Sequence, residues 1–136
     1  MNLLGVSNIF SPKRDGKPRQ LKRGTVYYAK LGKNIGSEQN GYRPVLVVQN
    51  HTANFSSPNV TIIPLTDALD NYGKPKRVLG THVEIEHPAL KMKSLAKTEY
   101  IINISKSRLI DEVCNIGKDK MIEVDEKIIL SLGIRN

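Results

Sequence analysis

Apolar and polar residues alternate along several short stretches between Leu21 and Ile104, and alternation at every second residue is typical of β-strands. In THVEIEH, from Thr81, Val83 and Ile85 fall on one face and the two glutamates on the other. PVLVVQN is apolar on both faces, which predicts a strand covered on both sides. The expected strands are GTVYYAKL from Gly24, PVLVVQN from Pro44, NVTIIPLT from Asn59, THVEIEH from Thr81 and LAKTEYIINI from Leu95.

The period of the pattern changes after Ser105, a residue suited to cap a helix. In KSRLIDEVCNI, Leu109, Val113 and Ile116 recur at helical spacing, and Gly117 follows as a stop signal. KDKMIEVDEKIILSL repeats the helical pattern with Met121, Val124, Ile128 and Leu132. Strands followed by two helices predict an α+β domain with an antiparallel sheet, open or curled into a small barrel.

The length of 136 residues fits one domain, which we expect over residues 21–136. The chain has 21 Lys and Arg against 13 Asp and Glu, a formal net charge of +8, and this balance favours a polyanion such as nucleic acid as partner. The first 23 residues hold six basic side chains and one acidic side chain. Residues 1–20 are therefore expected to form a basic, flexible arm.

Cys114 is the single cysteine, so the sequence predicts neither an internal disulfide nor a cysteine framework for zinc. We expect a reduced, cytoplasmic protein in which Cys114 packs beside the apolar stripe of the first predicted helix. The N-terminus does not follow the order of a secretory signal, and no stretch is long and apolar enough to span a bilayer. Neither a metal nor a cofactor is expected.

Five blocks of sequence keep their order between Leu21 and Ile134: KRGTVYYAKL, GSEQNGYRPVLVVQN, IIPLT, THVEI and KMIEVDEKIILSLGI. Together they resemble the MazF/PemK family of toxin endoribonucleases from bacterial toxin–antitoxin systems. The GSEQ-x-G-x-RPV block is the most specific of the five.

The resemblance implies a barrel related to SH3 folds that works as a homodimer and cuts single-stranded RNA at short sequences without metal. Products in this family carry a 2′,3′-cyclic phosphate and a 5′-hydroxyl. The family's catalytic arginine precedes Pro-Val at the start of the second strand and matches Arg43, and its catalytic threonine closes the third strand and matches Thr66. A MazE-like antitoxin, whose acidic, apolar tail occupies the RNA groove, is the implied partner.

The residue types at these two positions suit metal-free cleavage of RNA. The 2′-hydroxyl attacks its own phosphate in line, so the enzyme must hold that geometry and stabilise charge on the phosphate oxygens. The guanidinium of Arg43 can donate two parallel hydrogen bonds to phosphate and stays charged at every working pH. The Thr66 hydroxyl adds one more donor, and an antiparallel pairing of the second and third strands would bring the two residues together.

The sequence leaves the general base open. Arginine is a poor base near neutrality, because its pKa lies above about 12. Glu38, in the loop before Arg43, and Glu99, on the fifth predicted strand, are candidates, and His51 and His82 titrate in a suitable range. The alternatives for the histidines are an exposed turn position for His51 and a structural hydrogen bond for His82.

Contacts to RNA are expected mainly from two loops. The loop from Leu31 to Tyr42 is rich in glycine, and its backbone N–H groups and polar side chains can reach an anion or base edges. The loop after Thr66 carries basic residues that either grip the RNA backbone or only keep the loop soluble. The expected RNA-contacting residues are Gly36, Ser37, Glu38, Gln39, Tyr42, Lys76, Arg77, Thr81, His82, Glu99 and Tyr100.

The fifth predicted strand departs from the family pattern. Many members have Glu-Gln-x-Arg where this chain has Glu99, Tyr100, Ile101 and Ile102. Tyr100 either stacks on a base, in place of the contact that the family's glutamine amide would make, or belongs to the core. Ile102, in place of the family's arginine, cannot bind phosphate. These changes affect the recognised RNA sequence and, to a smaller extent, the activity.

Two other functions are compatible with the sequence. A poison of DNA gyrase, like the CcdB toxins on the same barrel, would make its contact through the C-terminal helix and would not need Arg43 and Thr66. An RNA-binding regulatory protein without nuclease activity would fit the changes at Tyr100 and Ile102. Arg43 and Thr66 together favour the endoribonuclease.

Overall fold

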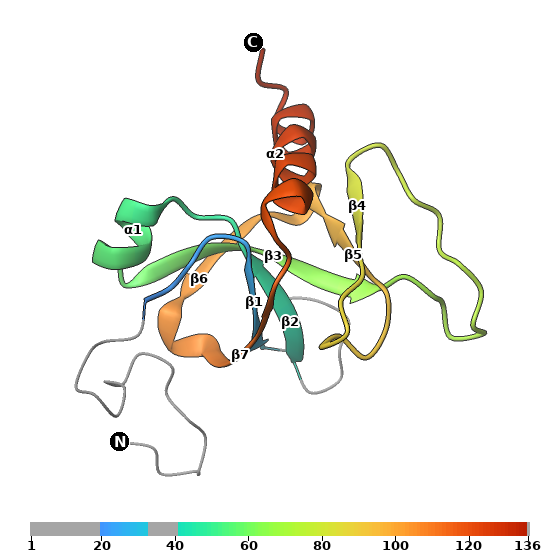
Figure 1. The fold of residues 1–136 in the computed structure, drawn as a ribbon, viewed down its shortest axis with the longest axis horizontal. Helices are drawn as coiled ribbons and strands as arrows, with labels where there is room; N and C mark the ends of the chain where they lie inside the picture. The colour runs from blue at the N-terminus through green and yellow to red at the C-terminus, as the bar shows by residue number, and fades with distance from the viewer. Residues whose placement is uncertain (1–19, 33–40, 136) are drawn as a thin grey trace.

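The structure is a computed structural model that describes residues 20–32 and 41–135 (Figure 1). The strands of this part are β1 (Thr25–Lys30), β2 (Tyr42–Val47), β3 (Asn59–Asp67), β4 (His82–Ile85), β5 (Ser94–Lys97), β6 (Ile102–Ser105) and β7 (Leu109–Asn115). The helices are α1 (His51–Ser56), α2 (Lys118–Leu132) and the 3₁₀-helices η1 (Thr98–Tyr100) and η2 (Lys106–Arg108). The basic arm expected over residues 1–20 lies outside the described residues, except for Gln20.

The described strands form one antiparallel sheet in the order β4-β5-β3-β2-β1-β7, and β6 pairs with β3 beside this path. β3 is long and changes its neighbour along one edge: residues 59–62 pair with β6 and residues 65–67 pair with β5. In Figure 1, β1, β2 and β7 cross β3 at a steep angle, because the sheet is strongly curled. The predicted α+β class, an antiparallel sheet followed by a C-terminal helix, is confirmed.

Hydrophobic side chains pack on both faces of this sheet. Val45 and Val47 belong to one buried cluster, whereas Leu46, between them in β2, belongs to a second cluster that includes Met121 and Val124 of α2. These β2 residues have no exposed surface. The prediction that the second strand is covered on both faces is therefore confirmed, and α2 supplies part of the cover.

The helix predicted after Ser105 is wrong, because Leu109–Asn115 forms β7 along the edge of β1. Ser105 caps only the single turn of η2, where its hydroxyl accepts a hydrogen bond from the Ser107 N–H at 3.3 Å. The pairing of β7 with β1 shifts its register at two points. Such irregularities break the period-two alternation of a strand, so the apolar residues of β7 recur at a helix-like spacing.

Cys114 consequently lies on a strand, not on a helix. It packs, partly buried, against the cluster that α2 covers, and burial raises the pKa of its thiol. A thiol with a raised pKa carries less thiolate and is less reactive. The prediction that Cys114 is a packing residue is confirmed, although its element was predicted wrongly.

Two further elements differ from the sequence expectation. The single strand expected over residues 95–104 is two strands, β5 and β6, which are separated by the turn of η1. β5 pairs with one part of β3 and β6 with the other. The short helix α1 was not predicted, although Asn50 caps it by accepting a hydrogen bond from the Ala53 N–H at 2.9 Å. The second predicted helix is confirmed as α2, with Met121 and Val124 buried but Leu132 exposed at its end.

None of the helices in the described part of the chain has the length and apolar character needed to cross a membrane.

Candidate active site

Arg43 and Thr66 lie on one face of the sheet, at the point where β2 and β3 separate. Val45 and Pro64 are the last paired residues of β2 and β3 at this end. Arg43 lies two positions before Val45, and Thr66 lies two positions after Pro64. Side chains two positions apart in a strand point to the same face of the sheet. Arg43 therefore lies on the same face as Val45, and Thr66 on the same face as Pro64. The antiparallel register thus brings the two predicted catalytic residues to the same end of neighbouring strands.

The polar groups of both residues are withdrawn from water. Arg43 is only 5% exposed, which is rare for a charged residue. The hydroxyl oxygen of Thr66 is buried and has no hydrogen-bond partner among the described residues. Leaving a buried hydroxyl unpaired costs about 1–3 kcal/mol, so this donor is suited to bind an oxygen of a ligand.

The same face continues across β5 and β4. Thr66 pairs with Leu95, and Lys97, two residues further along β5, pairs with His82 of β4. Directly paired residues point to the same side of a sheet, so Lys97 and His82 share this face with Arg43. Lys97 was not predicted as a site residue, although its alternation with Leu95 was a signal that could have placed it.

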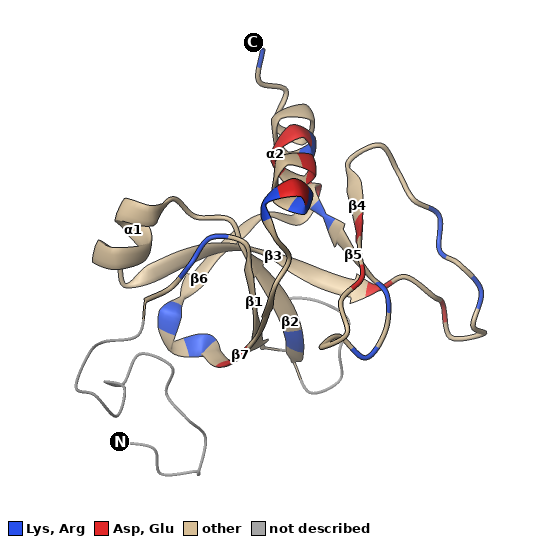
Figure 2. Ribbon diagram, in the orientation of Figure 1, with Lys and Arg blue, Asp and Glu red and all other residues tan. Residues whose placement is uncertain are grey.

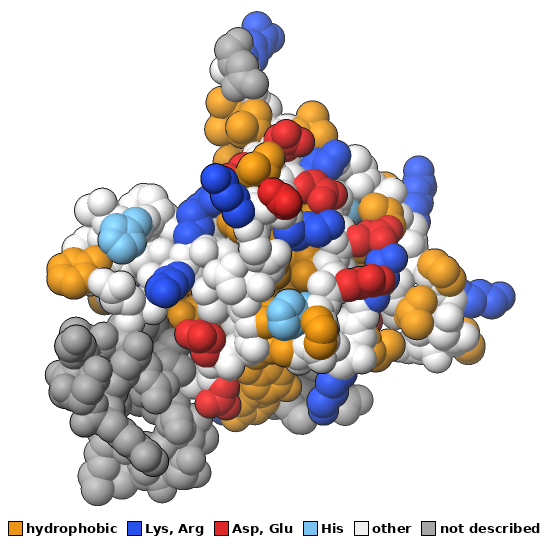
Figure 3. All heavy atoms as spheres, viewed as in Figure 1, with side chains coloured by type: hydrophobic (Ala, Val, Ile, Leu, Met, Phe, Trp, Pro, Cys, Tyr) orange, Lys and Arg blue, Asp and Glu red, His pale blue; other side chains and the backbone are white. Residues whose placement is uncertain are grey.

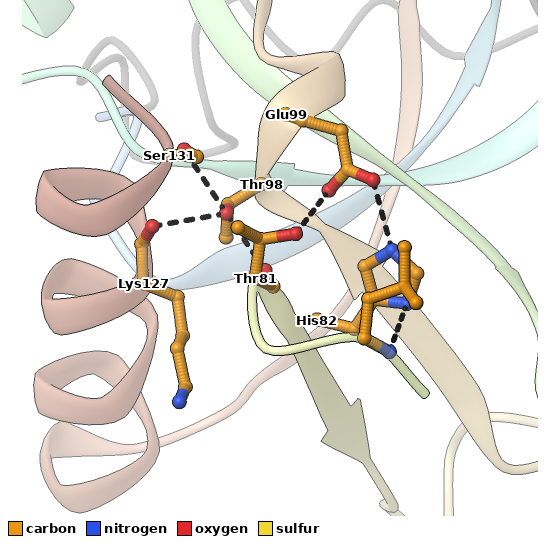
Figure 4. Close-up of polar contacts among 7 residues, drawn as sticks. Thr81, His82, Thr98, Glu99, Lys127 and Ser131 are labelled. Carbon is orange, nitrogen blue, oxygen red and sulfur yellow. Dashed lines mark hydrogen bonds and ion pairs between the residues drawn. The ribbon is translucent and has the colours of Figure 1, made fainter. Parts of the chain in front are cut away.

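Thr81, His82 and Glu99 form a hydrogen-bonded group between the start of β4 and η1 (Figure 4). The Thr81 hydroxyl donates to Glu99 Oε1 at 2.8 Å, and His82 Nε2 lies 2.9 Å from Glu99 Oε2. The Leu79 backbone N–H donates to His82 Nδ1 at 3.1 Å. Because this amide can only donate, Nδ1 is the acceptor, and Nε2 is the ring nitrogen that faces Glu99. The structural hydrogen bond considered for His82 is confirmed.

Glu99 is held as a carboxylate by this group. Its partial burial acts to raise the pKa, but hydrogen bonds from its own backbone amide, from His82 and from Thr81 prevail, and the pKa lies below its ordinary value. A carboxylate with a lowered pKa is a weaker base. Glu99 therefore suits a structural or RNA-contacting role better than that of general base.

Thr98 joins the same corner to α2, and sequence reasoning did not identify it. Its buried hydroxyl oxygen lies 2.7 Å from the carbonyl oxygen of Thr81, 3.1 Å from that of Lys127 and 3.2 Å from the hydroxyl oxygen of Ser131 (Figure 4). These contacts hold η1 between β4 and the C-terminal helix. Tyr100 is the last residue of the turn that these contacts hold.

Tyr100 and Ile102 mark the departure from the family pattern and have different environments. Tyr100 is 57% exposed, and Lys97 Nζ lies 5.9 Å from the centroid of its ring. A core position for Tyr100 is thereby excluded, and its ring is open to stacking with a base. Ile102 pairs with Ile62 and packs against the cluster that contains Val45, so it is a packing residue.

The remaining predicted residues are not all brought to this face. Tyr42 precedes Arg43 in β2 and so lies on the opposite face, where its ring stacks on Tyr28 with centroids 6.0 Å apart. His51 is exposed at the start of α1. Lys76 and Arg77 lie in the loop between β3 and β4. Gly36, Ser37, Glu38 and Gln39 lie outside the described residues.

Over residues 20–32 and 41–135, no group of three or more His, Cys, Asp or Glu side chains is arranged to hold a metal ion. The donors gathered on the site face are instead a guanidinium, an ammonium group and a hydroxyl. Such donors bind anionic oxygens such as those of phosphate.

Solved structures share this fold. A mycobacterial endoribonuclease in complex with its cognate antitoxin matches with a TM-score of 0.67 and 22% identity, over 85% of this chain and 98% of that chain. MazF from Deinococcus radiodurans matches with a TM-score of 0.66 and 18% identity, again over 85% and 98% of the two chains. These likenesses define the fold class as that of the MazF toxins.

Sequence relatives agree with the fold. The endoribonuclease MazF of Staphylococcus epidermidis is 40% identical over 118 residues, which cover 85% of this chain and 94% of that protein. The model of the PemK-like, MazF-like toxins of type II toxin–antitoxin systems matches residues 22–132. The chain belongs to this toxin family and is an enzyme of the MazF endoribonuclease type. The resemblance drawn from the sequence is confirmed.

Proposed function

We propose that this toxin cleaves single-stranded RNA at short sequences, without metal, by attack of a 2′-hydroxyl on the adjacent phosphate, and that cleavage of messenger RNA inhibits translation and growth. The observation that carries the proposal is the position of Arg43 and Thr66. The buried guanidinium of Arg43 lies on one face with the buried Thr66 hydroxyl, which alone of the two has no hydrogen-bond partner among the described residues, at the point where two strands separate. The two groups are donors suited to the oxygens of one phosphate.

Arg43 stabilises the transition state in this mechanism. As the 2′-oxygen forms its bond to phosphorus, negative charge grows on the non-bridging oxygens, and the planar guanidinium can donate two parallel hydrogen bonds to them. Burial strengthens the interaction, because water screens the charges less. Arg43 acts as an electrostatic group and not as a base, since it stays protonated throughout.

Thr66 adds a neutral donor to the same oxygens. Its hydroxyl has no competing partner among the described residues, so binding phosphate breaks no protein hydrogen bond. The bond from phosphorus to the 5′-oxygen then breaks, and the 5′-oxygen takes a proton and leaves as a hydroxyl. The phosphate remains on the other fragment as a 2′,3′-cyclic ester, and no water is consumed in this step.

Recognition of RNA involves the corner next to this face. Tyr100 presents an exposed ring, and Lys97 places its ammonium group beside that ring. A base stacked on Tyr100 would bring its phosphate near Lys97, and the carboxylate of Glu99 is positioned to accept from a base edge. Thr81 and His82 support Glu99 through hydrogen bonds, and Lys76 and Arg77 contact the RNA backbone.

The partners in this proposal are RNA, an antitoxin and a second copy of the chain. MazF of Deinococcus radiodurans has been solved as a MazE–MazF complex, and a mycobacterial relative with its cognate antitoxin. An antitoxin with an acidic, apolar tail would fit the basic RNA face and block it. We propose that the toxin acts as a homodimer in the cytoplasm. Sedimentation as a monomer at micromolar concentration would contradict the dimer.

The deciding experiment is cleavage of a long single-stranded RNA by the purified protein in EDTA, beside Arg43→Ala, with the ends of all fragments mapped. Fragments with 5′-hydroxyl ends at one repeated short sequence, absent with Arg43→Ala, are the expected result. Loss of activity in EDTA with recovery in magnesium would point to a metal nuclease. Intact RNA with folded wild-type protein would favour an RNA-binding protein without nuclease activity, and toxicity that survives in Arg43→Ala would favour a protein target such as gyrase.

A further inference from the structure

The loop between β3 and β4 protrudes from the body of the molecule and has an internal structure of its own (Figure 1). We call residues 68–79 the finger. Leu69 and Pro75 form an isolated antiparallel bridge, and the Lys76 N–H donates to the Ala68 carbonyl at 2.8 Å. The finger is therefore a short hairpin that extends β3 beyond Thr66.

The tip of the finger is a turn organised by Asp70. Its Oδ1 accepts hydrogen bonds from the backbone N–H groups of Tyr72 at 2.8 Å and Lys74 at 2.9 Å, and its own N–H donates to the Lys74 carbonyl at 2.8 Å. A turn held by three hydrogen bonds presents its residues at low cost in conformational entropy. The residue presented is Tyr72, which is 88% exposed.

Three basic residues follow this aromatic ring in the finger. Lys74, Lys76 and Arg77 follow Tyr72, residues 71–83 contain no acidic side chain, and none of the three cations forms an ion pair within the described residues. Figure 2 shows these basic positions on the finger, and Figure 3 shows hydrophobic and basic side chains together on the same protrusion. The acidic side chain of the finger itself is Asp70, whose Oδ1 accepts from the backbone amides of the turn. Further acidic residues lie at the base, where Asp67 precedes the finger and Lys93 pairs with Glu84 and Glu86.

An exposed aromatic ring among unpaired cations is the combination by which proteins bind single-stranded nucleic acid, since the ring stacks on a base and the cations contact phosphates. Tyr72 is six residues from Thr66 along the chain, so the two lie at most about 20 Å apart. Tyr72 is therefore close enough to Thr66 for one RNA strand to reach both residues, through nucleotides that flank the cleaved bond.

We propose that the finger is an accessory subsite for single-stranded RNA outside the cleavage sequence, with Tyr72 stacking on an unpaired base and Lys74, Lys76 and Arg77 contacting neighbouring phosphates. The inference rests on the proposed function, because it assumes that RNA occupies the face of Arg43 and Thr66. Such a subsite makes the enzyme prefer long, unpaired RNA over short RNA with the same cleavage sequence.

The test compares two RNAs: the shortest oligonucleotide that the wild type cuts, and a longer one that adds unstructured nucleotides on both sides. The ratio of kcat/KM for the long RNA to that for the short RNA is measured for wild type, Tyr72→Ala and Tyr72→Trp. The matched control is Phe55→Ala, because Phe55 is 77% exposed but lies on α1, at the opposite end of the molecule from the finger. Thermal unfolding shows that each variant is folded.

We expect Tyr72→Ala to lower this ratio about tenfold, mainly through KM for the long RNA, as expected when a stacked ring is removed. Tyr72→Trp and Phe55→Ala should keep the wild-type ratio. The double variant Lys76→Ala/Arg77→Ala should also reduce the salt dependence of long-RNA binding, by about 0.7 in log–log slope for each phosphate that these side chains neutralise in the wild type. Lys91→Ala/Lys118→Ala, which removes two lysines outside the finger, should leave that slope unchanged.

An unchanged ratio in Tyr72→Ala would overturn the inference while leaving the proposed function standing, provided that the wild type cuts both RNAs. An unchanged ratio together with weaker inhibition by the cognate antitoxin would assign the finger to a protein interface instead. If the wild type cuts no single-stranded RNA from which such an oligonucleotide could be derived, the result would count against the proposed function itself.

Discussion

Two polar regions on the same side of the sheet satisfy their hydrogen bonds differently. At the corner of β4 and η1, Glu99 accepts from Thr81 and His82, and His82 accepts from a backbone amide. At the end of β3, the buried hydroxyl of Thr66 has no partner among the described residues. A completed network stabilises the folded chain, whereas an unpaired buried donor lowers stability and leaves a group available to a ligand. The first region therefore holds the sheet in shape, and the second is suited to bind substrate.

The largest effect is expected from Arg43. Replacing it by Ala should lower kcat by about 10²–10³-fold, as for loss of a donor that acts in the transition state, and circular dichroism checks that the variant keeps the wild-type fold. Arg43→Lys keeps the positive charge but lacks the planar guanidinium that donates two parallel hydrogen bonds, so it should retain only part of the rate. Single-turnover cleavage of RNA measures both variants. A rate for Arg43→Ala near that of the wild type would remove Arg43 from the mechanism.

The second effect concerns stability at the corner of β4 and η1. His82→Ala leaves Glu99 without one donor and the Leu79 N–H without its acceptor, so the free energy of unfolding should fall by about 2–3 kcal/mol. The control is His51→Ala, because His51 is exposed on α1 and should change stability by less than about 0.5 kcal/mol. Urea unfolding gives both values. Equal stability of the two variants would show that the corner is not a structural clamp.

A matched pair of threonine substitutions sharpens the contrast. Thr66→Val removes a hydroxyl without a partner, so stability should stay equal or rise by about 1 kcal/mol, while cleavage slows about tenfold. Thr98→Val removes a hydroxyl that contacts Thr81, Lys127 and Ser131, and stability should fall by about 1–2 kcal/mol. Urea unfolding of both variants with RNA cleavage assays tests the pair. If Thr66→Val and Thr98→Val both lowered the free energy of unfolding, the difference between an unpaired and a paired hydroxyl would be contradicted.

The smallest effect is the pH dependence that Glu99 contributes. Because the pKa of Glu99 is lowered in the folded protein, its contribution to stability is fully present above the unfolded value of about 4.3. The contribution is lost as the pH falls through the lower folded pKa. The wild type should therefore lose more stability than Glu99→Gln between neutral pH and the acid range, as measured by urea unfolding at several pH values. Parallel curves would show that Glu99 has an ordinary pKa.

The sequence located the candidate site better than it located the elements around it. Arg43 and Thr66 were placed through short blocks that resemble a family, and the register of β2 and β3 agrees with that placement. The contact of Thr98 with Lys127 and Ser131 could not be predicted, because Thr98 is far in the chain from these two α2 residues and meets them only after α2 packs on η1. Lys97 joined the site face for a similar reason, since its position depends on the pairing of β5 with β3 and β4.

The sequence by itself determined the first four strands, the helix α2 and the family, because each depends on a local pattern of apolar residues or on a contiguous block. Only the tertiary structure decided that Leu109–Asn115 is a strand and that residues 95–104 bend at η1. The open edge of β1 supplies hydrogen bonds to β7 despite its helix-like spacing, and β3 offers two separate stretches for β5 and β6 to pair with. Pairing partners distant in sequence overrode the local periodicity, because backbone groups in a sheet are satisfied only by other strands.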